Sequence, residues 1–400
     1  WEQRKLSDMV ERVTRKNENL ESELPLTISA QYGLIDQNEF FDKRIASRDV
    51  SGYYLLKKGE FAYNKSTSSD APWGAVKRLD RYEMGVLSTL YIVFALKEDG
   101  NIDSDFLVSY YDTDCWHKGV QAIAAEGARN HGLLNITPAD YFETVLTVPS
   151  DVKEQHQIGT FFAKLDTLIT LHQRKCDALQ KFKKSMLQKM FPQNGESVPE
   201  IRFAGFTDAW EQRKFSELTE IRSASRVHKD EWQSSGVPFY RSSDVMAALN
   251  GTENEKAFIS EELYEKLSAV SGKLEKGDVL VTGGGSVGKP YIVPNNEPLY
   301  TKDADLLWIK NNENLDPYFV YTFFFSPTFT DYLNSVSHVG TIAHYTITQL
   351  GETPITLPCV SEQQKIGDYF RNLDFLITLH QRKLETLQKM KKSLLQKMFV

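Results

Sequence analysis

The chain has 400 residues, of which 41% are hydrophobic and 12% aromatic, so it can bury the cores of two or three domains. No apolar run approaches the ~18 residues that span a bilayer, and residues 1–20 lack the apolar core of a signal peptide, which predicts a cytoplasmic location. The formal charge of −7 argues against a generic nucleic-acid binder, and three scattered cysteines without CxxC spacing argue against a disulfide framework or a structural zinc site.

Residues 1–150 are predicted to form a mixed α/β domain. Short runs with strand character, EFAYN (60–64), STLYIVFAL (88–96) and ETVLTVP (143–149), alternate with turn signals. The loops between these runs carry polar, basic and aromatic side chains of the kinds that bind DNA phosphates and base edges. The candidate DNA-binding residues of this domain are Arg44, Arg48, Lys65, Ser66, Trp73, Lys77, Arg78, Arg129, Asn130 and His131. For each of them, a solvated surface side chain is the alternative interpretation.

A long helix is predicted to follow the first domain. Residues 154–191 contain no proline and a single glycine, Gly159, while Leu, Lys, Gln and Met dominate. Eight residues spaced alternately four and three apart predict the seam of a coiled coil: Leu165, Ile169, His172, Cys176, Leu179, Lys183, Met186 and Met190. About 35 helical residues span roughly 50 Å. We therefore assign residues 151–193 to a first spacer helix and residues 194–209 to a linker.

Residues 210–358 are predicted to form a second mixed domain. The run FISEELYEKLSA (258–269) predicts a helix, and KGDVLVT (276–282), DADLLWIK (303–310) and TPITLP (353–358) predict strands. The candidate DNA-binding residues of this domain are Arg222, Arg226, Lys229, Tyr240, Arg241, Ser242, Lys289, His338 and His344.

The stretch GGGSVGK (283–289) matches both GxGxxG and the start of a P-loop. Pro290 stands where a P-loop needs Ser or Thr for Mg²⁺, and PYIVP continues as extended chain instead of a phosphate-binding helix. This disfavours nucleotide binding and favours a glycine turn that brings backbone N–H groups and Lys289 close to a DNA phosphate. We find no zinc-protease, EF-hand, nucleophile-elbow or amino-methyltransferase signature, so the sequence predicts no catalytic site.

Residues 359–400 are predicted to form a second spacer helix that repeats the first. LDTLITLHQRK (165–175) returns as LDFLITLHQRK (373–383), and about two thirds of the positions paired between 154–191 and 362–399 are identical. Each helical copy carries a charge of +4, so basic surface is concentrated on the helices.

The repeat extends beyond the helices. WEQRK occurs at residues 1–5 and again at 210–214, which sets the period at about 208 residues. Because VPEIRFAGFTDA (198–209) precedes the second copy, repeat symmetry predicts a similar segment before the first. The intervening residues 6–150 and 215–358 are mutually dissimilar, so the sequence combines a constant frame with two different inserts.

The two helices are predicted to pair. The seam of the second copy consists of Leu373, Ile377, His380, Leu384, Leu387, Lys391, Leu394 and Met398. A second helix that leaves the second domain and pairs along the first must return toward the first domain, so the pair is antiparallel and has pseudo-two-fold symmetry. We interpret His172 and His380 as a polar pair that sets the register, not as catalytic residues. Outward side chains also repeat, which predicts two copies of one partner: Gln173, Arg174, Lys181 and Gln188 recur as Gln381, Arg382, Lys389 and Gln396.

The LITLHQRK…LLQKMF helices, the VPEIRF-GFTDAWEQRK bridge and the KKGEFAYNKS and EKGDVLVTGGGSVGK stretches resemble, over essentially the whole chain, the specificity subunit of type I restriction-modification enzymes. The resemblance implies an α+β fold in which two target-recognition domains each read one half of a split DNA sequence and two antiparallel helices form a coiled-coil spacer. It also implies two methyltransferase (modification) subunits and restriction/translocase subunits as partners. S-adenosylmethionine, ATP and Mg²⁺ would belong to those partners, and this chain would bind no cofactor or metal.

Two other functions remain open from the sequence alone. One is a non-enzymatic coiled-coil scaffold whose end domains bind proteins or other ligands, which the acidic charge of the domains favours. Salt-dependent DNA binding would distinguish it from a DNA reader. The other is a self-sufficient methyltransferase or nuclease that the helices merely decorate, and it predicts cofactor binding by the purified chain.

Overall fold

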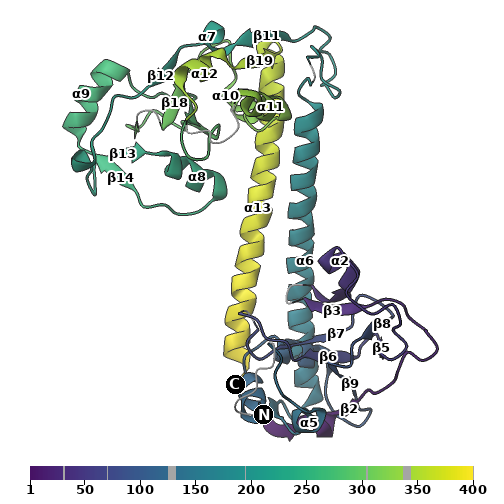
Figure 1. Cartoon of the computed structure of the whole chain (residues 1–400). Helices are drawn as coiled ribbons and strands as arrows, with labels where there is room; N and C mark the ends of the chain where they lie inside the picture. The colour runs from purple at the N-terminus through teal and green to yellow at the C-terminus, as the bar shows by residue number, and fades with distance from the viewer. Residues whose placement is uncertain are drawn as a thin grey trace. The chain divides into compact units, whose positions relative to one another are not determined.

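The computed structural model describes residues 1–29, 32–69, 71–124, 132–193, 195–302, 305–336 and 344–399. Two long helices, α6 (Val152–Lys189) and α13 (Val360–Met398), are its longest elements (Figure 1). The chain divides into two compact units, unit 1 (Trp1–Gln173 with Arg382–Val400) and unit 2 (Arg174–Gln381). Each unit thus combines one inserted domain with a part of each long helix. The boundaries predicted from the sequence instead separate the domains from the helices.

The domain of unit 1 is built around a four-stranded antiparallel sheet of strand order β2-β9-β6-β7, supplemented by the pairs β1-β10, β3-β4 and β5-β8. Its elements are β1 (Glu2–Lys5), α1 (Leu6–Met9), β2 (Val10–Arg12), β3 (Leu26–Ser29), β4 (Gly33–Asp36), α2 (Gln37–Phe41), β5 (Tyr54–Lys57), β6 (Phe61–Asn64), β7 (Ala75–Arg78), β8 (Met84–Leu87), β9 (Ile92–Leu96), α3 (Ser104–Tyr111), α4 (His117–Ile123), α5 (Pro138–Phe142) and β10 (Val145–Val148).

The domain of unit 2 contains a four-stranded antiparallel sheet of order β12-β18-β15-β16, a three-stranded sheet of order β14-β13-β17 and the pair β11-β19. Its elements are β11 (Glu211–Lys214), α7 (Phe215–Leu218), β12 (Ile221–Ser223), the 3-10 turn η1 (Lys229–Glu231), β13 (Val237–Tyr240), α8 (Ser242–Asn250), β14 (Ala257–Ile259), α9 (Glu261–Ser271), β15 (Val279–Thr282), β16 (Pro290–Ile292), β17 (Tyr300–Thr301), β18 (Leu306–Ile309), α10 (Pro317–Phe323), α11 (Pro327–Val336), α12 (Ile347–Glu352) and β19 (Pro354–Leu357).

The two domains share one scaffold although their sequences are dissimilar. The strands β2, β9, β6 and β7 of unit 1 correspond, in chain order and in sheet order, to β12, β18, β15 and β16 of unit 2. The pair β1-β10 likewise corresponds to β11-β19, and an ion pair recurs beside each: Lys5–Glu143 at 2.7 Å and Lys214–Glu352 at 2.5 Å. The fold of the inserts is therefore duplicated along with the helices, although residues 6–150 and 215–358 are dissimilar in sequence.

One buried glutamine ties each long helix to its domain. The Gln155 carboxamide accepts from the backbone N–H of Asp103 at 2.8 Å and donates to a proline carbonyl at the end of the domain at 2.8 Å. Gln363 makes the same contacts in unit 2, accepting from the Asp316 N–H at 3.0 Å and donating to a proline carbonyl at 2.9 Å. Both glutamines are buried, so these hydrogen bonds hold the start of each helix against its own domain.

The elements that the sequence predicts are found at the predicted residues, with one exception. Strands β6, β9, β10, β15, β18 and β19 all fall within the predicted strand runs, and α6 and α13 lie within the predicted spacer helices, residues 151–193 and 359–400. The predicted helix at residues 258–269 is wrong at its start, because Ala257–Ile259 pairs with β13 as a strand. Helix α9 begins after Ser260, whose hydroxyl accepts from the Leu263 N–H at 3.1 Å and caps it.

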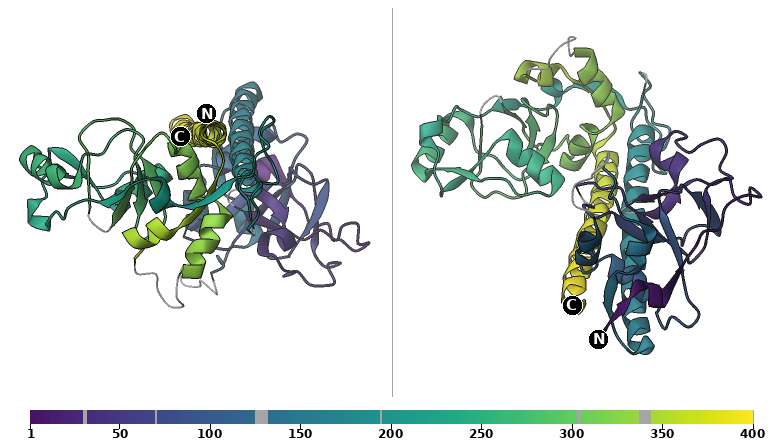
Figure 2. Two further views of the ribbon diagram at one scale, coloured as in Figure 1. Left: turned by 90° about the horizontal axis from the view of Figure 1, so that it is seen from above. Right: turned by 60° about the horizontal axis from the view of Figure 1, so that its bottom comes forward.

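Within each unit the helix segments lie side by side and run antiparallel (Figures 1 and 2). In unit 1, Phe162 and Leu165 share a core with Leu395 and Phe399, so the start of α6 meets the end of α13. In unit 2 the end of α6 shares a core with the start of α13. Every residue of both heptad seams is buried or half-buried, and most neighbouring positions are exposed.

Candidate nucleic-acid interface

In unit 1, two candidates follow β6, where the chain turns toward β7. Lys65 accepts through its carbonyl from the Leu134 N–H at 3.0 Å, and Ser66 forms a β-bridge with Leu133. The Lys65 ammonium donates to the Ile136 carbonyl at 3.3 Å, so it is partly engaged within the domain. Arg129, Asn130 and His131 lie outside the described residues. Trp73 closes the same loop, half-buried against the core, and its carbonyl accepts from the Tyr63 hydroxyl at 2.8 Å.

In unit 2, the equivalent loop is the glycine turn between β15 and β16. The Gly283 carbonyl accepts from the Tyr345 N–H at 2.6 Å, and Gly284 bridges to His344. The Asp305 carbonyl accepts both from the Gly283 N–H at 2.8 Å and from the Ser242 hydroxyl at 3.0 Å. The structure therefore brings Ser242, the glycine turn and His344 together. His338 lies outside the described residues.

The glycine turn does not have the backbone of a P-loop. Strand β16 follows it, as Pro290 predicts, and no phosphate-binding helix begins there. The N–H groups of Gly283, Val287, Gly288 and Lys289 already have partners within the domain, so few remain to bind an anion. The Lys289 ammonium lies 5.8 Å from the centre of the Phe325 ring. The Lys183 ammonium lies 5.2 Å from the centre of the same ring.

Four of the basic candidates are neutralised by carboxylates of their own domain. A DNA phosphate would have to displace these partners, so such side chains are better suited to holding the fold than to binding DNA. The ion pairs are Lys77–Asp112 at 2.7 Å, Arg78–Asp80 at 2.7 Å, Arg222–Glu220 at 2.6 Å and Arg241–Asp244 at 3.0 Å.

The remaining basic candidates are exposed. Arg44 donates to the carbonyls of Ser47 and Arg48 at 3.0 and 3.3 Å within its own loop. Arg48, Arg226 and Lys229 have exposed side chains, so phosphate binding by them needs no rearrangement of an ion pair. The aromatic candidate of unit 2, Tyr240, is half-buried with its ring 5.4 Å from that of Tyr291.

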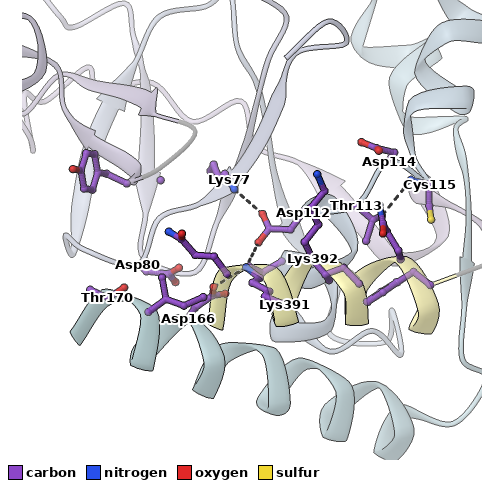
Figure 3. A pocket seen from close by; sticks show the side chains of 18 residues that line it. Lys77, Asp80, Asp112, Thr113, Asp114, Cys115, Asp166, Thr170, Lys391 and Lys392 are labelled. Atoms are coloured by element: carbon purple, nitrogen blue, oxygen red, sulfur yellow. Dashed lines mark hydrogen bonds and ion pairs between the residues drawn. The ribbon is translucent and has the colours of Figure 1, made fainter. Parts of the chain in front are cut away.

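An ionic network that the sequence analysis missed joins the first domain to the helices inside unit 1. Lys391 of α13 donates to Asp112 at 2.7 Å and to Asp166 of α6 at 2.6 Å, and Asp112 also accepts from Lys77 (Figure 3). Burial by itself raises the pKa of Asp112, but the charges of Lys77 and Lys391 outweigh it and leave that pKa below its ordinary value. Burial likewise opposes the charge of Lys391, and the two carboxylates nevertheless raise its pKa.

The network borders a cavity of 970 Å³ between the domain and the helix segments of unit 1 (Figure 3). Asp166 and Lys391 recur as Asp374 and Lys183, so a repeated Asp–Lys couple was visible in the sequence. No sequence pattern indicated that Asp112 pairs with Lys391, because the two residues lie 279 positions apart and Asp112 belongs to a non-repeated insert.

The chain is similar to several known proteins. Residues 207–389 match the model of the type I restriction modification DNA specificity domain. The type I restriction enzyme MjaVIII specificity subunit of Methanocaldococcus jannaschii is 24% identical over 263 residues, which are 64% of this chain and 61% of that protein. The chain is therefore similar to type I restriction enzyme specificity subunits.

Two further proteins extend the comparison. A Haemophilus influenzae protein provisionally named as a type I specificity subunit is 29% identical over 178 residues, 42% of this chain and 43% of that protein. The crystal structure of the S subunit from M. genitalium covers 100% of this chain and 96% of its own, with a TM-score of 0.63 at 15% identity, and thus shares the fold. The matched stretches span less than two thirds of either curated relative.

The family model covers most of the second copy of the repeat, and the first copy has a sheet of the same strand order. Among the described residues, no group of His, Cys, Asp and Glu has the arrangement of a metal site. No helix in the described part of the chain is long and apolar enough to cross a membrane. The pairing predicted for His172 and His380, which are half-buried and belong to different units, stays a prediction.

Proposed function

We propose that this chain is the DNA sequence-specificity subunit of a type I restriction-modification complex, and that each unit reads one half of a bipartite DNA target. The observation that carries this proposal is the duplicated scaffold with unlike loops. The β6-β7 and β15-β16 connections occupy equivalent places, yet one carries Lys65, Ser66 and Trp73 and the other a glycine turn. Equivalent loops with different side chains suit two readers of two different half-sites.

The seam of α6 and α13 supports a spacer role. A continuous helical pair transmits a fixed separation along its length, and two readers can contact one duplex only when their separation suits the helical repeat of about 34 Å per turn. We propose that the helices set the gap between the half-sites.

Repeated exposed apolar residues support docking of two identical partners. Leu168 and Leu171 of α6 are 43% and 46% exposed, and their repeat counterparts Leu376 and Leu379 of α13 are 40% and 37% exposed. Apolar side chains outside the seam and present in both copies fit one methyltransferase (modification) subunit per copy.

We propose that restriction/translocase subunits join this assembly and that S-adenosylmethionine, ATP and Mg²⁺ bind to those partners. The chain itself would be non-catalytic and cytoplasmic.

A matched heptad insertion tests the proposal. Duplicating residues 173–179 in α6 and residues 381–387 in α13 preserves the seam and lengthens both helices by roughly 10 Å, or about three base pairs. We expect the gap of the modified motif to grow while both half-sequences stay the same, as measured by single-molecule methylation sequencing with the partner subunits present. An unchanged gap with an altered half-sequence would refute the spacer role.

A further inference from the structure

A groove of 470 Å³ lies beside the tip of the glycine turn in unit 2. Its walls include Ser243 of α8, Asn254 of the loop after α8, and Gly285 and Ser286 of the turn. Asn254 also lines an adjoining cavity of 640 Å³, which Tyr240 borders. The groove is therefore next to the place where Ser242, the glycine turn and His344 meet, although the sequence analysis singled out neither Ser243 nor Asn254.

The amide of Asn254 has a fixed orientation. Its Nδ2 donates to the Asp244 carboxylate at 2.7 Å and to the Ser243 hydroxyl at 3.0 Å. A carboxylate only accepts hydrogen bonds, so the nitrogen of the amide and not its oxygen must face Asp244. Both N–H groups are thereby used within the domain. The group that Asn254 offers to a ligand is its carbonyl oxygen, Oδ1.

Arg241 and Asp244 position this amide. Asp244 accepts from the backbone N–H of Arg241 at 2.8 Å and from its Nε at 3.0 Å, and its side chain is only 10% exposed. Arg241 thus forms an ion pair with Asp244, and Asp244 in turn accepts a hydrogen bond from Asn254. A side chain locked by such a network contacts a ligand without losing rotamer freedom on binding.

The charges around the groove select the kind of group that can enter. Glu253 lines the groove with an exposed carboxylate, and the guanidinium of Arg241 is neutralised by Asp244. No Lys or Arg is among the described residues that line the groove, so its acceptors disfavour a phosphate and favour a hydrogen-bond donor. On the major-groove edge of DNA, the amino groups of adenine (N6) and cytosine (N4) are donors, whereas guanine O6 and N7 and thymine O4 are acceptors.

We propose that Asn254 accepts a hydrogen bond, through Oδ1, from the exocyclic amino group of one base in the half-site that unit 2 reads. This inference rests on the proposed function and names a specificity-determining residue for it. Because the amide nitrogen is already engaged, Asn254 cannot make the two-bond contact that selects adenine alone. It distinguishes amino bases, adenine or cytosine, from keto bases.

The first test replaces Asn254 by alanine in the full chain and reads the modified motif in the presence of the partner subunits. We expect one position of one half-site to become degenerate, with a roughly five- to thirty-fold loss of discrimination, and the other half-site to stay intact. Asn295→Ala is the matched control, because Asn295 is an exposed turn residue of the same unit whose carboxamide oxygen accepts locally from the Glu297 N–H. It should leave the motif unchanged.

A second test identifies the base by measuring DNA binding, so it does not depend on a change in the methylated motif. Each adenine or cytosine of the half-site is replaced in turn by purine or 2-pyrimidinone, which lack the amino group, and binding by the wild-type complex is compared with binding by Asn254→Ala. We expect one position where the wild type loses affinity and the variant does not. An adenine at that position identifies N6 as the donor, and a cytosine identifies N4.

The outcomes separate the two proposals. A wild-type complex without any bipartite motif would overturn the proposed function. A wild-type bipartite motif that Asn254→Ala retains at every position, with a melting temperature equal to that of wild type and no altered response to the base analogues, would overturn the role of Asn254 alone.

Discussion

The ammonium group of Lys391 lies 2.6 Å from the carboxylate of Asp166 in unit 1. The same couple recurs in unit 2, where Lys183 lies 2.5 Å from Asp374, so each unit fastens its two helix segments together with one copy of a repeated ion pair. Among the described residues, the pair in unit 1 has a further carboxylate partner in its domain, Asp112, whereas Lys183 of unit 2 lies 5.2 Å from the centre of the Phe325 ring. An ion pair between Asp112 and Lys391 therefore links the first domain to α13.

Replacing Asp112 by alanine should destabilise unit 1. Lys391 and Lys77 are only 16% and 22% exposed, and the substitution leaves both with a buried positive charge that has lost a carboxylate. Removing one partner of a buried pair costs about 3 kcal/mol in the free energy of unfolding. Urea denaturation followed by circular dichroism measures this loss. Asp368→Ala, which removes a carboxylate from the exposed pair with Arg371, should cause no measurable change.

The contribution of Asp112 should depend on pH in a defined direction. Its pKa is lowered from 3.8 in the folded chain, so its stabilising effect is complete above that value and is lost as pH falls through the lowered pKa. The pKa of Lys391 is raised from 10.5, so its effect is complete below that value and is lost as pH rises further. The difference in unfolding free energy between wild type and Asp112→Asn should therefore be constant from about pH 5 to 9 and shrink below about pH 4. A difference that vanished already at pH 6 would contradict the network.

The helices were predictable because local patterns determine them. A seam repeated every three and four residues, without proline, specifies a long helix whatever surrounds it, and the strand runs were visible for the same reason. The common scaffold of the domains was not predictable from one sequence, because backbone pairing fixes the sheets while many apolar side chains can fill their cores.

The candidate site was only partly predictable. Composition identified loops rich in Arg, Lys and Ser, and the structure brings Ser242, the glycine turn and His344 together as one surface. The carboxylates that pair with Arg78, Arg222 and Arg241 lie only two or three positions away, so these pairs were visible in the sequence. The partner of Lys77, Asp112, lies 35 positions away, and composition could not reveal it. The orientation of Asn254 depends on such contacts too.

Two glycines in the long helices should resist substitution. A Cβ atom on Gly159 would overlap the backbone at Phe106, where α3 begins, and one on Gly367 would overlap Asp316 and Phe319 at the start of α10. Either glycine replaced by alanine should therefore lower the unfolding free energy by about 1–3 kcal/mol despite the better helix propensity of alanine. Thermal denaturation checks this. Gly52→Ala is the control, because a Cβ there meets no atom within 4 Å.

Exchange of the first domain should alter half of the target. Replacing residues 6–150 with the corresponding domain of another family member should change one half-site and preserve the other together with the gap, because unit 2 keeps its own loops and its own helix pair. Methylation sequencing of the hybrid complex measures this outcome, and simultaneous change of both half-sites would contradict independent reading.

The same domain exchange tests the ion pair between Asp112 of the first domain and Lys391 of α13. A donor domain with a carboxylate at the position of Asp112 should keep Lys391 paired, whereas a donor with an apolar residue there, like Phe325 near the end of the equivalent helix of unit 2, leaves Lys391 with Asp166 alone. We therefore expect hybrids of the second kind to unfold at lower urea concentration, and introducing Asp at that position should restore stability. Equal stability of both kinds would show that domain packing, and not this charge, holds unit 1 together.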